Sequence, residues 1–267
     1  MILKFEPENH SYTSDDNKKW TSVTTLISAY KEPFDAPAIA LKCSKNKRSK
    51  WYGIAPQEIQ DIWKSEALRA TTLGSYYHDQ RETDVLSCDT MNRHGVDLPV
   101  FKTVEDDDGV KIAPTQKLEE GIYPELFIYL QSAYICGQAD LVEVANGLVH
   151  VGDYKTNKKI DMTSYVNWEG KSKKMLSPLQ HLDDCNYMHY ALQLSLYLYM
   201  ILKHNPNLKP GKLVLHHVAF VQAEETDEFG FPITLQENGE PAVKEITYYE
   251  VPYLKREVEL LLKKKRW

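Results

Sequence analysis

The dipeptide Asn146-Gly147 constrains this sequence most, because it lies between two runs of strand-forming residues. A two-residue hairpin turn needs positive φ at both positions, which asparagine and glycine tolerate well. We therefore expect a β-hairpin with strands over 139–145 and 148–155, in which Ala145 pairs with Leu148.

In this register the hairpin places two carboxylates opposite each other. Asp140 lies five residues before Ala145 and Asp153 lies five residues after Leu148. Lys155 shares their face, because side chains alternate along a strand. Two such carboxylates repel by about 1 kcal/mol in water and nearer ~4 kcal/mol when partly buried, whereas an ordinary cross-strand pair contributes only about 0.2–1 kcal/mol. The arrangement favours a bound divalent cation. The alternative is a structural salt-bridge cluster in which Lys155 offsets part of the repulsion.

The composition is that of an ordinary soluble globular protein: 267 residues, 42% hydrophobic, 26% charged, with a net charge of −6. The negative charge excludes a generally basic protein that coats nucleic acid, so any DNA contact has to come from local basic patches. The four cysteines are widely spaced and include no Cys-x-x-Cys pair, which argues against a zinc ribbon or an iron–sulfur cradle.

Targeting and membrane signals are missing from the sequence. No basic-then-apolar leader opens the chain, and the longest strongly apolar run, 191–202, is too short to span a bilayer. With the cysteines expected to be free thiols, we expect a cytoplasmic protein, in the host cytoplasm if a phage encodes it, with no membrane partner.

The order of the expected elements indicates one mixed α/β domain over 1–267, with a central sheet and helices packed against it. We divide it into an N-terminal helical part (1–85), a polar, exposed insertion (86–120), a core (121–204), and C-terminal strands and a helix (205–267). Helices are expected from near Ser22 or Thr24, in parts of 36–55, and over 59–85, 178–204 and 253–267. Strands are expected over 123–134, 139–145, 148–155, 212–222 and 244–251.

Five sequence elements resemble those of a known family. They are Ser22-Val23-Thr24 after a His10-x-Tyr12 strand, Gly74-x-x-x-His78, Gly137-x-x-Asp140, Asp153-Tyr154-Lys155-Thr156 and Gln193-x-x-x-Tyr197. Their order resembles the RecB-type exonuclease branch of the PD-(D/E)XK nuclease superfamily, which includes phage exonucleases and the mitochondrial genome-maintenance exonuclease. The resemblance covers roughly residues 10 to 200. Ala139 stands where the superfamily has proline, and 86–120 and 205–267 match nothing in the family.

The resemblance implies a restriction-endonuclease-like mixed sheet and a metal centre. The implied ligands of one or two Mg²⁺ or Mn²⁺ ions are His78, Glu125, Asp140, Asp153 and the backbone carbonyl of Tyr154. For His78 the alternative is an ordinary surface or core histidine, and for Glu125 a solvated strand residue. Iron–sulfur members of the family carry three clustered downstream cysteines, whereas the last cysteine here is Cys185, so we expect no cluster.

The implied catalytic residues are Asp140, Asp153, Lys155, Gln193 and Tyr197. Lys155 would orient or deprotonate the attacking water, or neutralise charge on the phosphate. Gln193 and Tyr197 lie one helical turn apart and share a face. We expect Gln193 to bond near the Lys155 strand and Tyr197 to approach the DNA backbone or the site. The alternative for this pair is core packing.

Residues expected near DNA phosphates lie before and after this core. Ser22 and Thr24 belong to the resemblance, and their alternative role is to cap a helix. Thr156 and the lysines of the following loop would track the phosphate backbone, unless that loop is simply solvated. These lysines are Lys158, Lys159, Lys171, Lys173 and Lys174, of which we select 158, 159, 173 and 174 as DNA-binding.

Taken with the resemblance, these features predict a metal-dependent exonuclease. We expect its partner to be DNA with a free end, single-stranded or partly so, in phage or mobile-element recombination, repair or processing, and a recombination protein is a candidate second partner. The alternatives are a non-catalytic DNA-binding or inhibitory protein that retains the fold, a structure-specific endonuclease, and a hydrolase of another phosphodiester.

Overall fold

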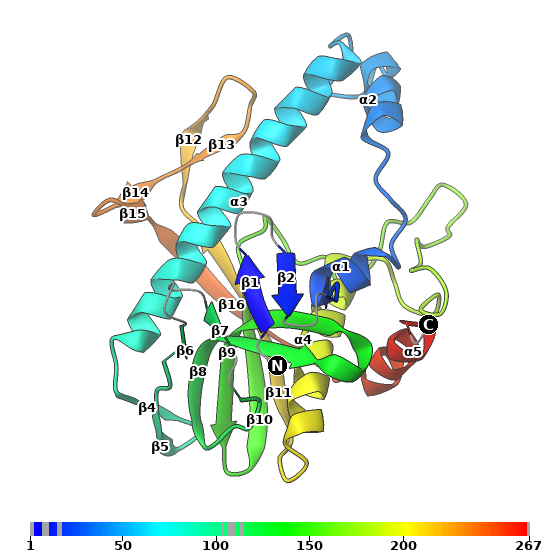
Figure 1. The fold of residues 1–267 in the computed structure, drawn as a ribbon. Helices are drawn as coiled ribbons and strands as arrows, with labels where there is room; N and C mark the ends of the chain where they lie inside the picture. The colour runs from blue at the N-terminus through cyan, green and yellow to red at the C-terminus, as the bar shows by residue number, and fades with distance from the viewer. Residues whose placement is uncertain are drawn as a thin grey trace.

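A computed structural model describes residues 3–6, 11–14, 18–102, 104–105, 111–112 and 115–265. At its centre is a mixed six-stranded sheet in the order β16-β11-β10-β9-β3, with β8 also paired to β9 (Figure 1). The β10–β11 and β3–β9 pairs are parallel and the others are antiparallel. The strands are β3 (Thr21–Ser22), β8 (Gly121–Leu130), β9 (Ile135–Ala145), β10 (Leu148–Lys155), β11 (Lys209–Phe220) and β16 (Val243–Val251).

Helices lie on both faces of this sheet (Figure 1). One face packs against α1 (Val23–Ser28), α4 (Asn186–His204) and α5 (Lys255–Lys265), which share the largest apolar core with it. The opposite face is crossed by the long helix α3 (Pro56–Leu86), and α2 (Ala36–Lys45) packs against α3. The expected α/β class, with a mixed central sheet flanked by helices, is therefore confirmed.

The largest core forms where the apolar face of the central hairpin meets α4. Val142 and Val144 of β9 and Val149 and Val151 of β10 are at most 1% exposed. The facing helix α4 is apolar almost all round, with eleven buried residues, as expected of a helix enclosed by other elements. The site residues that extend from this face of the hairpin are therefore mounted on the most rigid part of the fold.

The Asn146-Gly147 turn forms as predicted, with φ of 52° at Asn146 and 72° at Gly147. The β9–β10 register also follows the prediction, from the pair Ala145–Leu148 to the pair Leu141–Gly152. The ladder ends there, one step before Asp140 and Asp153. These two residues are consequently not a ladder pair, and the expectation that they face each other directly across the strands is corrected.

Several smaller elements differ from the sequence-based expectations. Within 86–120, the hairpin of β4 (Thr90–Arg93) and β5 (Val96–Pro99) is largely exposed, as expected, with five of its eight residues exposed, but it is attached to the sheet through Leu98, which is buried against Val85 and Ile122. The acidic run 105–108 lies mostly outside the described residues. Helix α4 begins eight residues later than the expected residue 178.

The remaining strands are short. They are β1 (Leu3–Glu6), β2 (Ser11–Ser14), β6 (Val104–Glu105), β7 (Lys111–Ile112), β12 (Gln222–Thr226), β13 (Pro232–Thr234), β14 (Gln236–Glu237) and β15 (Glu240–Pro241), and a 3-10 turn, Gln131–Ala133, links β8 to β9. Among the described residues no helix combines the length and the apolar character needed to cross a bilayer.

Gly137 of β9 provides a test of this packing. A Cβ atom at this position would lie 2.6 Å from Cε1 of Tyr197, whose side chain is 3% exposed. We predict that Gly137→Ala lowers the free energy of unfolding by about 1–3 kcal/mol, because a closely packed ring has to move. Thermal unfolding measures the effect.

The matched control is Gly152→Ala on the neighbouring strand, where the nearest atoms are 3.5 Å from the added Cβ. This variant should keep the melting temperature of the original protein. Equal melting temperatures for the two variants would contradict the packing of Tyr197 against Gly137.

Candidate metal and active site

Asp140 lies at a break in the central sheet. Along one edge of β9 the pairing with β8 skips the positions of Glu125 and Asp140, between the pairs Pro124–Leu141 and Leu126–Ala139. Along the other edge, β10 pairs only as far as Leu141, and β3 pairs only with Ile135 and Cys136. One β8 pair is thus missing at Asp140 within a continuous register, and the β9–β10 pairing ends beside it. This opening gives side chains from other elements access to its carboxylate.

The backbone of Glu125 is part of this break. Its φ is 47°, in the left-handed region, which costs a residue with a Cβ roughly 1–2 kcal/mol. Strain of this kind persists only where the surrounding structure imposes it, and it is concentrated at functional sites. Here it places the Glu125 carboxylate 3.9 Å from Nδ1 of His78.

The carboxylate of Asp140 occupies the place of the missing ladder partner. Its Oδ2 accepts a hydrogen bond of 2.7 Å from the backbone N–H of Tyr154. The same oxygen lies 3.4 Å from Nδ1 of His78. A side chain has therefore replaced a strand carbonyl as the acceptor, which explains why the two strands separate at this point.

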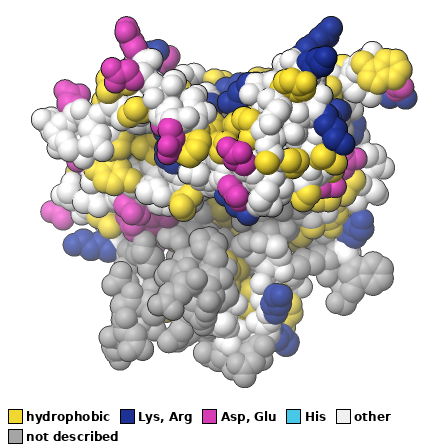
Figure 2. All heavy atoms as spheres, turned by 90° about the horizontal axis from the view of Figure 1, so that it is seen from above, with side chains coloured by type: hydrophobic (Ala, Val, Ile, Leu, Met, Phe, Trp, Pro, Cys, Tyr) yellow, Lys and Arg dark blue, Asp and Glu magenta, His cyan; other side chains and the backbone are white. Residues whose placement is uncertain are grey.

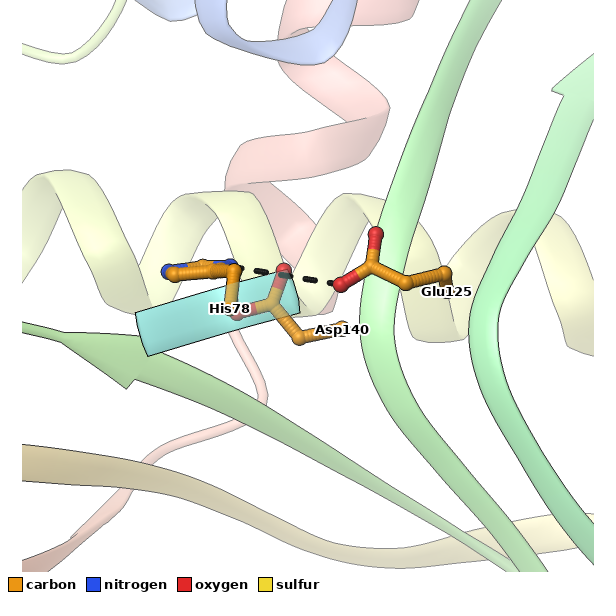
Figure 3. Close-up of side chains that lie close together, drawn as sticks. All are labelled: His78, Glu125 and Asp140. Carbon is orange, nitrogen blue, oxygen red and sulfur yellow. Dashed lines mark ion pairs between the residues drawn. The ribbon is translucent and has the colours of Figure 1, made fainter. Parts of the chain in front are cut away.

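His78 reaches this opening from α3, on the opposite face of the sheet (Figure 3). A carbonyl oxygen can only accept, so Nε2 of His78 carries a hydrogen and donates it to the carbonyl of Tyr154 at 3.1 Å. Nδ1 then faces the two carboxylates. One turn earlier on α3, a Cβ at Gly74 would lie 3.1 Å from Oγ1 of Thr156, so glycine allows the close approach of α3 that His78 requires.

The charges around His78 determine its protonation. Burial lowers the pKa of the ring, but the hydrogen bond and charge of Asp140, together with the charges of Asp153 and Glu125, outweigh burial and raise the pKa to about 9. The His78 imidazolium thus offsets the negative charge of the carboxylates at neutral pH. In turn, the pKa of Asp140 is lowered. Burial raises it, but the hydrogen bond and charge of His78 and the charge of Lys155 outweigh burial.

Asp153 and Lys155 form a second, adjacent charge pair. Nζ of Lys155 lies 2.5 Å from Oδ2 of Asp153, which is 1% exposed. Burial raises the pKa of Asp153 to about 6. The carboxylates of Asp153 and Asp140 outweigh burial at Lys155 and raise its pKa. The ammonium also lies 4.8 Å from the ring centre of Tyr190 on α4. Lys155 is therefore a fixed cation.

The donor set fits a divalent metal ion. Among the described residues, His78, Glu125 and Asp140 form the one group of three or more ligand side chains whose donor atoms all lie within 4.8 Å of one another. Oxygen ligands suit Mg²⁺ and Mn²⁺, and imidazole adds affinity for transition metals. Nearby, Oδ1 of Asp153 is buried with no hydrogen-bond partner among the described residues, which is a costly state for an isolated carboxylate oxygen.

This grouping changes the expected roles of two residues. Asp153 lies outside the three-residue group and is engaged with Lys155, although its free oxygen remains available. The carbonyl of Tyr154, an expected ligand, accepts the N–H of His78 instead.

Gln193 and Tyr197 are brought together on α4, and Nε2 of Gln193 donates to the Tyr197 hydroxyl at 3.2 Å. Tyr197 is 3% exposed and packs against Gly137 at the opening in β9. Because Tyr197 is buried, it lies against the site and is not exposed to a DNA backbone. Gln193 donates to Tyr197, and among the described residues it forms no hydrogen bond with β10.

Ser22 is the last residue of β3 and pairs with Cys136 of β9, and Thr24 follows in α1. Ser22 caps α1: its Oγ accepts from the N–H of Thr25 at 3.0 Å and lies 3.0 Å from Oγ1 of Thr24. The capping alternative is therefore confirmed for Ser22, and the phosphate contact stays a prediction.

The loop lysines are all ion-paired in this structure. Their partners are Glu66 for Lys158, Asp161 for Lys159, Glu169 for Lys171, Asp184 for Lys173 and Asp183 for Lys174. The exposed pairs of Lys159 and Lys171 contribute little, so Lys159 can exchange its carboxylate for a phosphate, whereas Lys173 is paired with a buried carboxylate. Sequence reasoning left Tyr190 without a role, although its position three residues before Gln193 places it on a neighbouring part of the same helix.

Comparisons of the chain with protein-family models, with curated proteins and with solved structures find no match. Three clustered ligand side chains, a buried carboxylate with a free oxygen, and a fixed lysine cation together provide the groups needed for metal-assisted hydrolysis of a phosphate ester.

The pKa of His78 predicts how the stability of the metal-free protein depends on pH. The folded-state pKa, about 9, is above the ordinary value of 6.5. The stabilisation from protonated His78 is then fully present below about pH 6.5 and is lost as the pH rises through 9. Relative to His78→Gln, the original protein should lose roughly 1–3 kcal/mol of unfolding free energy between these limits.

Denaturant unfolding in a chelator at several pH values measures this difference. Asp153, whose pKa is raised to about 6, is present in both proteins, so its own titration near the lower end of this window largely cancels in the difference. A difference between the two proteins that stays constant from pH 6.5 to 9.5 would show that His78 is not held protonated by its carboxylate neighbours.

The donor set also predicts that metal ions stabilise the fold. At a concentration 100 times the dissociation constant, Mn²⁺ should raise the free energy of unfolding by about 2.7 kcal/mol. Glu125→Gln and Asp140→Asn should lose most of this increment. The matched control is Glu143→Gln, a carboxylate on the same strand as Asp140 that pairs with Arg93 and His94, and it should retain the increment. Equal increments in all variants would place the ion elsewhere.

Proposed function

We propose that this chain is a magnesium- or manganese-dependent deoxyribonuclease that hydrolyses phosphodiester bonds, with action at free DNA ends as the favoured mode. The observation that carries the proposal is the break in the sheet at Asp140. There, His78 and Glu125 converge on the Asp140 carboxylate beside the buried Asp153–Lys155 pair. The order of the motifs, which resembles RecB-type exonucleases, supports DNA ends as the substrate.

His78, Glu125 and Asp140 would hold the metal ion, and Oδ1 of Asp153 is the further oxygen available to it. When bound, the ion supplies Lewis-acid activation of the phosphate and lowers the pKa of a water molecule. A bound ion would also compensate two unfavourable features of the site. These are the strained backbone of Glu125 and the Asp153 oxygen that has no hydrogen-bond partner among the described residues.

We expect Lys155 to act on the phosphate as a charge rather than as a base. In the metal-free site the charges of Asp153 and Asp140 outweigh burial and raise its pKa. An ammonium fixed by Asp153 and by the ring of Tyr190 is already oriented when negative charge develops on the scissile phosphate, and it needs no rearrangement to stabilise that charge. Of the roles expected for Lys155, charge neutralisation is thus favoured.

Gln193 and Tyr197 support this arrangement from α4. The Gln193–Tyr197 hydrogen bond lies beneath the opening in β9, where Tyr197 packs on Gly137. The charges of Asp153 and Asp140 act on the Tyr197 hydroxyl, whose pKa is raised, first by burial and then by these charges. A neutral hydroxyl at this position positions the carboxylates without adding charge, so we assign the pair a positioning role.

The proposal is tested with end-labelled linear DNA and covalently closed circular DNA, each incubated with Mg²⁺ or Mn²⁺. The original protein should degrade the linear DNA and leave the circle intact. Asp153→Asn and Lys155→Ala should each reduce the rate about 100- to 1,000-fold, the usual effect of removing one group that stabilises transition-state charge.

Lys212→Ala serves as the control, because this lysine is 62% exposed and pairs with Glu250. It should keep the original rate. Cleavage of the circle would indicate an endonuclease. No degradation of either DNA in any metal, or full activity of Asp153→Asn, would refute the proposed enzyme.

A further inference from the structure

The segment between β10 and α4, residues 156–185, carries the most exposed large hydrophobic side chain among the described residues. Trp168 is 90% exposed, and Tyr165 in the same segment is 74% exposed. In Figure 1 this segment (yellow-green) projects from the body beside α1. In Figure 2, seen from above, a hydrophobic group projects at that edge of the molecule with acidic and basic side chains beside it.

Trp168 is presented by a hydrogen-bonded hairpin, residues 165–173. Its strands are joined by the Val166–Ser172 bridge and by hydrogen bonds from the N–H of Asn167 to the carbonyl of Lys171 (2.9 Å) and from the N–H of Lys173 to the carbonyl of Tyr165 (2.9 Å). The tip is fixed as well, because Oδ1 of Asn167 accepts from the N–H groups of residues 169 and 171. The tryptophan therefore lies on a defined turn.

The base of the 165–173 hairpin is attached to the residues that precede α4. Lys174 bridges to Asp183, and their side chains form an ion pair of 2.6 Å. Lys173 pairs at 2.8 Å with Asp184, whose side chain is 4% exposed. Because the hairpin is held at both its tip and its base, a ligand that binds its aromatic side chains pays little for ordering the chain.

The fold gives no reason for these exposed aromatic rings. A fully buried tryptophan removes about 150–250 Å² of surface from water, and isolated exposed apolar side chains are common. Here, however, two aromatic rings are exposed within four residues of each other on a hydrogen-bonded hairpin. An aromatic side chain in such a position is suited to contact a flat, partly apolar ligand surface.

The lysines around the hairpin point to the ligand. Residues 156–185 contain five lysines and four acidic residues, a net charge of +1 in a chain whose net charge is −6. Aromatic rings combined with positive charge are the pattern that binds single-stranded nucleic acid, in which bases stack on the rings and the cations follow the backbone. A purely apolar protein surface would not need these lysines for binding.

The segment that carries the hairpin begins directly after Lys155 at the end of β10 and ends at the start of α4. Oδ1 of Asn186, at the start of α4, accepts from the N–H of Asp161 within the segment, and Tyr190 of α4 lies beside Lys155. One chain segment therefore joins the hairpin to the Asp153–Lys155 pair.

We infer that Trp168 and Tyr165 of the 165–173 hairpin form a stacking site for unpaired bases of the DNA substrate. This inference rests on the proposed function and extends it: the substrate is DNA with a single-stranded segment, and the hairpin binds that segment through the faces of its bases.

The test measures binding in a chelator, where no cleavage occurs. Fluorescence anisotropy of a labelled single-stranded oligonucleotide should give a dissociation constant about 5- to 100-fold weaker for Trp168→Ala, the usual loss for one stacked base. Trp168→Phe should stay within about threefold of the original protein. An oligonucleotide with abasic sites should bind the original protein as weakly as the intact strand binds Trp168→Ala.

Leu68→Ala is the control, since Leu68 on α3 is 67% exposed and carries no stacking ring. It should bind like the original protein. An unchanged dissociation constant for Trp168→Ala, or no preference for intact over abasic DNA, overturns the inference and leaves the hairpin as a surface for a protein or a lipid.

The two proposals can fail separately. Binding that depends on Trp168 without any metal-dependent cleavage would refute the nuclease and keep the stacking site. Cleavage of DNA together with full-strength binding by Trp168→Ala would keep the nuclease and refute the stacking site.

Discussion

The hydrogen bond between the Asp140 carboxylate and the Tyr154 N–H determines the geometry of the candidate site. In a regular ladder, a backbone carbonyl of the neighbouring strand accepts the hydrogen bond from this N–H, and the pairing continues. When a carboxylate accepts it, the two strands separate, and the side chains beyond this point no longer have to alternate between the faces of a closed sheet. His78 can then reach Asp140 from the opposite face, and the backbone of Glu125 can turn towards both.

The sequence predicted local features well. The Asn146-Gly147 turn requires positive φ, which is a property of two adjacent residues. Both the turn and the five residue pairs of the β9–β10 register could therefore be predicted from it. The long apolar stretch of α4 and the aromatic strand β8 were also evident. Glu125 was a candidate only through the resemblance, because its left-handed conformation depends on neighbours distant in sequence. The direct pairing of Asp140 with Asp153 failed because the pleat rule assumes an unbroken ladder.

Other differences have equally specific causes. Residues 178–185 were expected to be helical, yet this stretch, which contains the buried Leu179, forms turns and ion pairs instead. Strands of two or three residues, such as β13 to β15, are too short to carry a periodic pattern. The role of the 165–173 hairpin was not evident because exposure depends on the surrounding fold, and a tryptophan in the sequence is more often buried.

Helix α3 has a mechanical consequence for the site. It spans 31 residues, which corresponds to a rod roughly 46 Å long. Its first half extends away from the sheet together with α2, and its second half carries His78 to Asp140 (Figure 1). The helix comes close to Thr156, the residue after β10, at Gly74, and its buried Tyr77 and Val85 pack against residues of the sheet. The position of His78 is therefore set by the packed half of the rod and not by its outer half.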